Sequence, residues 1–348
     1  MAFTTVNKGS LNMSPKLYTG NGSTNAITGV GFQPDLTWIK IRDAAGESHS
    51  WWDAVRTATK YISSNNTNIE ATDATGLTAF DSDGFTLGST GRVNQNSNTF
   101  ASWNWKANGA GSSNSNGSIT STVSANTTAE FSIVSWTGTS TNATVGHGLG
   151  SIPKMIIVKN RDNTTGWGVY HASLGNTKYL QLNDSAAEGT ASTFWNDTTP
   201  TNQVFSIGTS GWVNNTGEEY IAYCFADVNG YSKMGKYTGI GQTSGSFIYT
   251  GFKPAFILIK RTTSAYDWYV YDNQRPGYND TNLSLRANTD QNESTSSGYP
   301  LDILSNGFKI RTDNAAVGGN ADPYIYAAFG QTIVGTNNVP ATTRVMLE

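Results

Sequence analysis

The sequence predicts an all-β protein built from three tandem antiparallel β-sandwich units, and three observations support this. First, one pattern recurs at residues 18–42, 136–161 and 237–261: an aromatic-Thr-Gly opening, a Gly-rich turn, a proline, a hydrophobic run and a lysine. Second, the proline follows the opening aromatic by 16, 17 and 17 residues and precedes the lysine by six each time. Third, the chain is rich in Gly and in aromatic residues, which favours strands joined by turns. A period of roughly a hundred residues suits small domains.

The first predicted unit covers residues 1–107 and opens with a short polar leader. The alternation of polar and apolar residues in DLTWIKIR indicates a strand. The expected strands of this unit are 35–42, 80–87, which is entered through a turn, and 100–106. Within residues 51–62, Trp52, Val55 and Thr59 fall near helical spacing, which predicts a short helix.

Residues 108–130 consist almost entirely of Ser, Thr, Asn and Gly. Such a segment has too little apolar surface to offset the entropy of ordering, so the sequence predicts an unstructured linker that tethers unit 1 loosely. An insertion of this length also explains the spacing of the repeats. The matched lysines Lys40 and Lys159 are 119 residues apart, whereas Lys159 and Lys260 are 101 apart.

The second and third predicted units cover residues 131–228 and 229–333, and residues 334–348 form a C-terminal tail. A connection of only a few residues predicts that these two units pack together. The apolar run 155–158 has no alternation, which indicates a strand covered on both faces. The other expected strands are 131–136, 167–171, 178–182, 204–208, 220–226, 255–261, 267–271, 283–287, 307–311 and 324–329.

An aromatic pair five residues apart closes each predicted unit. The pairs are Phe100 and Trp105, Tyr220 and Phe225, and Tyr324 and Phe329. With the opening strand included, about eight short strands fall in each unit. That number of antiparallel strands in about a hundred residues favours a jelly-roll sandwich, with a seven-stranded immunoglobulin-like sandwich as the alternative.

Composition argues against several classes of protein. Only 14% of the residues are charged and the net charge is -3, so no basic surface for nucleic acid is expected. The apolar runs are too short to span a membrane, and MAFTTVNKGS lacks the pattern of a signal peptide. Cys224 is the only cysteine, so no intrachain disulfide can form, and its surroundings YIAYCFA predict a buried apolar position.

No repeated catalytic or metal-binding group is expected. The glutamates that precede the C-terminal tail are not found at matched positions of the repeats, which argues against an acid/base pair; they are Glu47, Glu70, Glu130, Glu188, Glu218, Glu219 and Glu293. The histidines His49, His147 and His171 lack metal-ligand spacing. Residues 81–84 (DSDG) predict a β-turn, since the glutamate of a calcium loop is missing downstream. The sequence therefore predicts no catalytic residue, no metal and no cofactor.

One repeated feature suggests ligand binding. After the lysine-ended strand, each unit places aromatic residues next to an aspartate or a histidine; the candidate residues are Trp52, Asp53, Trp167, Tyr170, His171, Trp268, Tyr271 and Asp272. A tryptophan beside a cation and a carboxylate can stack on a sugar ring and hydrogen-bond it, which predicts a glycan platform. The alternative is packing, in which an arginine pairs with the aspartate over a tryptophan and closes the end of the sandwich.

Several long motifs resemble those of one family. They include MAFTTVNKGS, LYTGNGSTNAITGVGFQPD, GHGLGSIPKMIIVKNRD, YHASLGNTKYLQLN, YIAYCFADVNGYSKMGKYTG and GFKPAFILIKR. They are similar to virion proteins of marine tailed bacteriophages described as tail-fibre or concanavalin A-like lectin domain proteins. The resemblance covers nearly the whole chain. It implies a structural protein of the virion surface with a lectin-like sandwich fold, and it implies no catalytic site.

We therefore expect a non-enzymatic virion surface protein, assembled in the host cytoplasm. As a tail-fibre or adhesin-like protein it would bind host surface polysaccharide, as a homo-oligomer such as a trimer, through several weak sites at once. As a capsid decoration protein it would instead be anchored to other virion proteins through its leader, residues 1–17, or its tail, residues 332–348. A polysaccharide-degrading enzyme is a remote alternative.

Overall fold

The computed structural model describes residues 3–276, 278–294 and 298–332, and its fold is all-β, as predicted, with several antiparallel sheets. In these residues the helical elements are short: η1 (Gly9–Leu11), α1 (Gly91–Asn94) and α2 (Ser192–Trp195). The helix predicted within residues 51–62 is wrong. Thr57 and Thr59 have φ angles of 73° and 72°, which a right-handed helix excludes, and the segment forms two strands joined by a turn.

Unit 1 (residues 3–107) contains a main sheet, a small sheet and a two-stranded pair. The main sheet has the order β1-β9-β3-β4, with β1 (Met13–Thr19), β9 (Thr99–Trp105), β3 (Leu36–Ile41) and β4 (Ser50–Asp53). The small sheet has the order β2-β8-β7, with β2 (Asn25–Thr28), β8 (Gly84–Leu87) and β7 (Leu77–Asp81). The turn predicted at residues 81–84 joins β7 to β8. The pair consists of β5 (Lys60–Tyr61) and β6 (Ala71–Thr72).

Unit 2 (residues 108–228) repeats this order in the strands β12 (Phe131–Thr137), β19 (Glu219–Phe225), β14 (Met155–Asn160) and β15 (Gly168–His171). The sheet continues on one side through β16 (Lys178–Gln181) and β17 (Gly189–Thr190), and on the other through β11 (Ser121–Asn126) and β10 (Ser112–Asn114). A small sheet pairs β13 (Ala143–Gly146) with β18 (Val204–Ile207).

Unit 3 (residues 229–332) repeats the order again. Its main sheet is β20-β27-β22-β23-β24, with β20 (Ser232–Thr238), β27 (Pro323–Gln331), β22 (Lys253–Arg261), β23 (Trp268–Asp272) and β24 (Leu285–Arg286). Its small sheet is β21-β26-β25, with β21 (Phe247–Tyr249), β26 (Gly307–Ile310) and β25 (Leu301–Leu304). Residues 334–348, the predicted tail, lie outside the described residues.

The segment expected to be an unstructured linker is ordered. Residues 108–130 contain β10 and β11, and β11 pairs with β12 of unit 2. Backbone pairing satisfies a strand whatever its side chains, and Val123 in β11 and Ala129 in the turn after it are buried. Ala107 and Gly109 donate backbone N–H bonds to the carboxylate of Asp35 at 2.7 and 3.1 Å, so the connection to unit 1 is fixed rather than loose.

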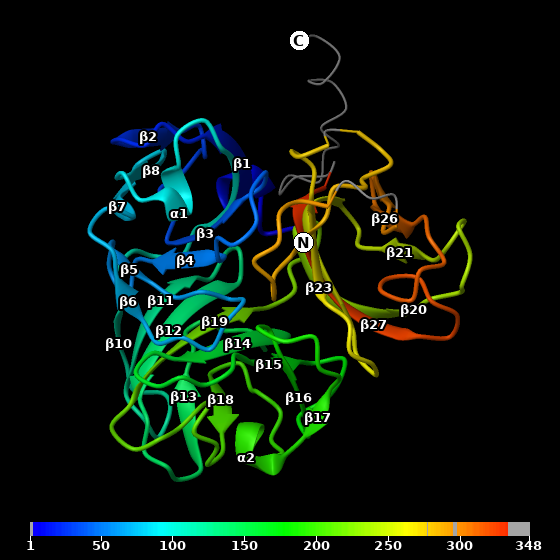
Figure 1. The fold of residues 1–348 in the computed structure, drawn as a ribbon. Coiled ribbons are helices and arrows are strands. Elements are labelled where there is room, and N and C mark those ends of the chain that lie inside the picture. Colours follow the sequence, from blue (N-terminus) through cyan, green and yellow to red (C-terminus); the bar gives the residue numbers. More distant parts are fainter. Residues whose placement is uncertain (1–2, 277, 295–297, 333–348) are drawn as a thin grey trace.

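Each unit has its own hydrophobic core, and the three main sheets also share one. The shared cluster takes buried side chains from all three units. At its centre lie the closing aromatics Trp105, Phe225 and Phe329, whose ring centroids are 5.4 to 6.2 Å apart in all three pairs. The units therefore form three lobes around a common core with approximate three-fold symmetry (Figure 1).

Candidate functional site

The strand registers show which residues of the three units are equivalent. Leu36, Met155 and Phe256 on the central strands pair with Asp53, His171 and Asp272, so the last three occupy one structural position. By the same register Trp52, Tyr170 and Tyr271 are equivalent. Continuing the strands by one residue matches Trp167 and Trp268 with His49.

The predicted glycan platform is not formed by the eight residues proposed for it. All eight are at most 2% exposed, so none presents a ring face or a carboxylate to a sugar; they are Trp52, Asp53, Trp167, Tyr170, His171, Trp268, Tyr271 and Asp272. Both faces of the main sheets are covered, one by the core of the unit and the other by the shared core. The alternative of packing fits these positions, because arginines pair with Asp53 and Asp272 at 2.6 Å.

A loop of each unit lies against the next unit and forms an interface. Residues 63–70 of unit 1 contact unit 2 at the first interface, and residues 181–188 of unit 2 contact unit 3 at the second. Residues 286–293 of unit 3 return to unit 1 at the third interface, which closes the ring.

These loops share an Asn-x4-Glu pattern, and this corrects the expectation that no glutamate is repeated. The pattern is Asn65 and Glu70, Asn183 and Glu188, and Asn288 and Glu293. The glutamate follows the matched lysine by 30, 29 and 33 residues, so alignment from that lysine hides the match. The asparagine Oδ1 accepts the backbone N–H of the matched ring residue, His49, Trp167 or Trp268, at 2.7 to 3.0 Å.

Three hydrogen bonds recur at each interface. Their partners on the loop lie seven residues before the loop glutamate, three residues before it, and at the glutamate itself. The ring N–H of Trp167, Trp268 or His49 donates to the carbonyl of Ser63, Gln181 or Arg286 at 2.7 to 3.0 Å. The ammonium of Lys159, Lys260 or Lys40 donates to the carbonyl of Thr67, Ser185 or Asp290 at 3.0 to 3.3 Å. The backbone N–H of Glu70, Glu188 or Glu293 donates to the carbonyl of Arg161, Thr262 or Arg42 at 2.7 or 2.8 Å.

Burial sets the protonation of the groups at these interfaces. It lowers the pKa of each of the three lysines Lys40, Lys159 and Lys260 to about 8. His49 is neutral, because burial lowers its pKa well below the ordinary value. Its Nδ1 accepts the indole N–H of Trp38 at 2.8 Å, so its proton lies on Nε2, which faces the Arg286 carbonyl.

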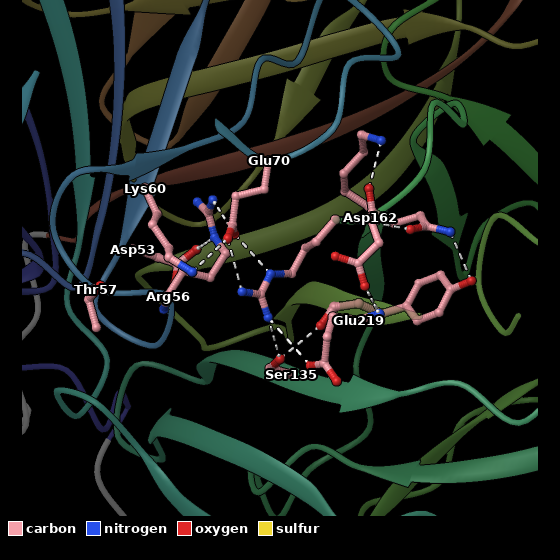
Figure 2. A network of polar contacts seen from close by, with 12 residues as sticks. Asp53, Arg56, Thr57, Lys60, Glu70, Ser135, Asp162 and Glu219 are labelled. Carbon is pink, nitrogen blue, oxygen red and sulfur yellow. Dashed lines mark hydrogen bonds and ion pairs between the residues drawn. The ribbon is translucent and has the colours of Figure 1, made fainter. Parts of the chain in front are cut away.

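At the first interface a network of ion pairs connects unit 1 to unit 2 (Figure 2). The guanidinium of Arg56 binds Asp53 at 2.6 Å and Glu70 at 3.4 Å, and Arg161 binds both oxygens of Glu70 at 2.9 and 3.1 Å. Lys60 adds a contact to Glu70 at 3.2 Å. Burial alone would raise the pKa of Glu70, but the bonds and charges of Arg161 and Arg56 lower it to about 2.

The third interface repeats this network with other residues. Arg275 binds Asp272 at 2.6 Å and Glu293 at 3.0 Å, and Arg42 binds both oxygens of Glu293 at 3.0 and 3.1 Å. Trp103 donates its indole N–H to Asp272 at 3.0 Å. Burial would raise the pKa of Asp272, but the charge of Arg275 and its bonds lower it.

The second interface keeps the glutamate without the arginines. His171, Leu174 and Thr262 stand where the first interface has Asp53, Arg56 and Arg161. Glu188 retains Lys178 at 3.4 Å, the equivalent of the contact between Lys60 and Glu70. A cleft of about 500 Å³ opens here; its lining is Ser173, Leu174, Glu188, Lys236, Tyr237, Thr238, Thr262, Thr263, Pro323, Tyr324 and Ile325.

Other predicted positions have structural surroundings. Cys224 is fully buried, as expected, and burial raises the pKa of its thiol to about 12. Among the described residues, no group of three or more His, Cys, Asp or Glu side chains is arranged to hold a metal ion. None of the helices in the described part of the chain has the length and apolar character that a membrane crossing requires.

Comparison with known proteins gives one match. A family model described as "Domain of unknown function (DUF7483)" matches residues 8–332. No curated protein and no solved structure matches the chain.

Proposed function

The chain belongs to the DUF7483 family, and we propose that it is a non-enzymatic structural protein of a phage virion surface, tail-fibre or adhesin-like, that contacts host surface glycans. One observation carries the non-enzymatic part of the proposal. The polar groups that recur in all three units are tied to the interfaces: the lysine ammonium, the ring N–H and the backbone N–H of the loop glutamate bond across them, and the asparagine holds the loop to its own unit. Selection for a rigid body explains this repetition without a reactive centre.

Ring closure supports a role in which the protein must remain folded while exposed. Each unit is held by both of the others through a shared core and matched hydrogen bonds. Opening one unit would expose the apolar faces of the other two, so local unfolding is penalised. The three lobes in one chain also supply several surfaces at once, the multiplicity that a homo-oligomer such as a trimer would otherwise provide.

Unit 3 carries a surface suited to an external partner. On the edge strand β21, Phe247 and Tyr249 are 48% and 57% exposed on either side of the buried Ile248. At the two equivalent positions, strand β2 has Ala26 and Thr28, and strand β13 has Thr144 and Gly146. Exposed aromatic rings at positions where the other units have small residues support contact with a ligand.

We propose that each unit is a jelly-roll, concanavalin A-like sandwich domain, because each has a separate core between its main and small sheets. The immunoglobulin-like sandwich is the alternative. A solved structure of a second member of the family, compared with known sandwiches, tests this assignment.

A capsid decoration protein is the second candidate, and one observation favours it. The backbone N–H of Gly9 donates to the side-chain oxygen of Gln331, so residues near the two ends of the described chain lie side by side. A protein anchored to a capsid at one site would have such an arrangement.

Labelling of purified particles with antibody distinguishes these candidates. Label at the tail tip supports the adhesin, and label over the capsid faces supports decoration. Absence of the protein from particles would refute both. A turnover assay on host polysaccharide addresses the remote enzyme alternative, since hydrolysis abolished by a single carboxylate substitution would contradict a non-enzymatic role.

A further inference from the structure

The cleft at the second interface occupies the space that an arginine side chain fills at the other two. The backbone N–H groups of Arg42, Arg161 and Thr262 bond the carbonyls of Thr99, Glu219 and Pro323, so these three residues are equivalent. The arginine side chains at the first two positions reach their loop glutamates. Thr262 is too short to do so, and the volume remains open.

The charges around this volume also differ between the interfaces. At the first interface Arg161 lies beside Ser135 at 3.4 Å and Glu219 at 3.5 Å, in addition to Glu70 (Figure 2). By strand register, Lys236 takes the place of Ser135 and Pro323 that of Glu219. Compared with the first interface, the second interface therefore lacks one carboxylate and the arginine, and it has one additional ammonium group.

The resulting lining has the chemistry of a site for a hydroxylated ring. Ser173, Thr238 and Thr263 supply hydroxyls and Glu188 supplies an acceptor, while Leu174 belongs to an apolar wall. Lys236 is exposed, and within the described residues no hydrogen bond or ion pair engages its ammonium. A cleft of about 500 Å³ lies within the range of small-molecule sites.

We propose that this cleft binds an acidic sugar unit of a surface polysaccharide. The sugar hydroxyls bond Glu188 and the serine and threonine side chains, and the sugar carboxylate pairs with Lys236. This proposal rests on the proposed glycan-binding function and places the contact between units 2 and 3, away from the eight residues predicted from the sequence.

The test uses the full chain with short oligomannuronate as the acidic probe and cello-oligosaccharide of equal length as the neutral one. Thr262→Arg should fill the cleft with the arginine that the other interfaces already have, and should lower affinity for the acidic probe by about tenfold or more. Thr262→Val keeps the shape and should change affinity little. Thr28→Arg, on the outward face of β2, adds the same charge far from the cleft and should leave binding unchanged.

Lys236→Ser gives a second test that leaves the interface packing intact, since Lys236 is exposed. It should remove the preference for the acidic over the neutral probe, and thermal unfolding of each variant verifies that it is folded. Acidic binding that is equal in wild type and Thr262→Arg, or the absence of binding to oligomannuronate, overturns the cleft proposal. In the first case glycan binding by the protein stands and only its location is wrong; localisation of the protein away from virions would refute the proposed function independently.

Discussion

Replacing Glu70 by glutamine should cost the protein far more stability than the same change at Glu188. The carboxylate of Glu70 accepts from Arg161, Arg56 and Lys60, and Arg56 is fully buried. Its pKa of about 2, against an ordinary 4.5, corresponds to about 3 kcal/mol of stabilisation at about 1.4 kcal/mol per pKa unit. Arg56 loses one of its two carboxylate partners but keeps Asp53 at 2.6 Å, so the cost does not reach that of an unpaired buried charge. We expect Glu70→Gln to lose about 3 kcal/mol.

The equivalent change Glu188→Gln is the matched control, because Glu188 has the same place in its loop and keeps one partly exposed lysine at 3.4 Å. It should lose less than about 1 kcal/mol, as partly exposed ion pairs do. Urea unfolding followed by tryptophan fluorescence measures both free energies of unfolding.

The dependence on pH gives the same prediction a second readout. Because the pKa of Glu70 is depressed in the folded state, its stabilisation is complete above about pH 4.5 and is lost as the pH falls toward about 2. The difference between wild type and Glu70→Gln should therefore shrink across that window. Equal losses for Glu70→Gln and Glu188→Gln at pH 7, or a difference that does not change with pH, would show that the arginine network does not stabilise the first interface.

Three further predictions follow from other buried groups. Trp105→Ala should destabilise all three units in one transition, by about 3 to 5 kcal/mol, in calorimetry, because its ring contacts Phe225 and Phe329; separate melting of unit 1 would contradict the shared core. Burial lowers the pKa of Lys159 to about 8, so between pH 8 and pH 9 the unfolded chain binds more protons than the folded protein. The free energy of unfolding of the wild type, relative to that of Lys159→Met, should therefore rise by about 1 kcal/mol over this range. A constant or falling difference in urea unfolding refutes this. Cys224 should resist thiol reagents at pH 8 until urea unfolds the protein, because burial raises its pKa to about 12, and rapid labelling of the native protein would be inconsistent with that burial.

The sequence was most informative where backbone and apolar residues repeat. The spacing between the matched proline and lysine placed the central strands, and the closing aromatics Trp105, Phe225 and Phe329 proved to be structurally equivalent. These positions are fixed by strand length and core packing, which tolerate few insertions. All-β structure could therefore be predicted from one chain.

The interfaces could not be predicted in the same way. Aromatic and carboxylate side chains side by side fit either an exposed sugar platform or a buried join, and only the packing of one unit on another decides between them. The loop glutamates were missed because the loops before them differ in length, although the Asn-x4-Glu pattern at Asn65, Asn183 and Asn288 was present as a signal. The strands β10 and β11 were missed because backbone pairing satisfies them although few of their side chains are apolar.

The return of the last third of the chain to the first has a consequence for biosynthesis. Lys40 bonds a carbonyl at Asp290, 250 residues later, and Arg42 pairs with Glu293, so the third interface can form only after residue 293 has been synthesised. Before Phe256 is synthesised, Trp38 and Trp103 lack the ring that contacts them in the finished protein. An intermediate with such exposed apolar surface is prone to aggregate.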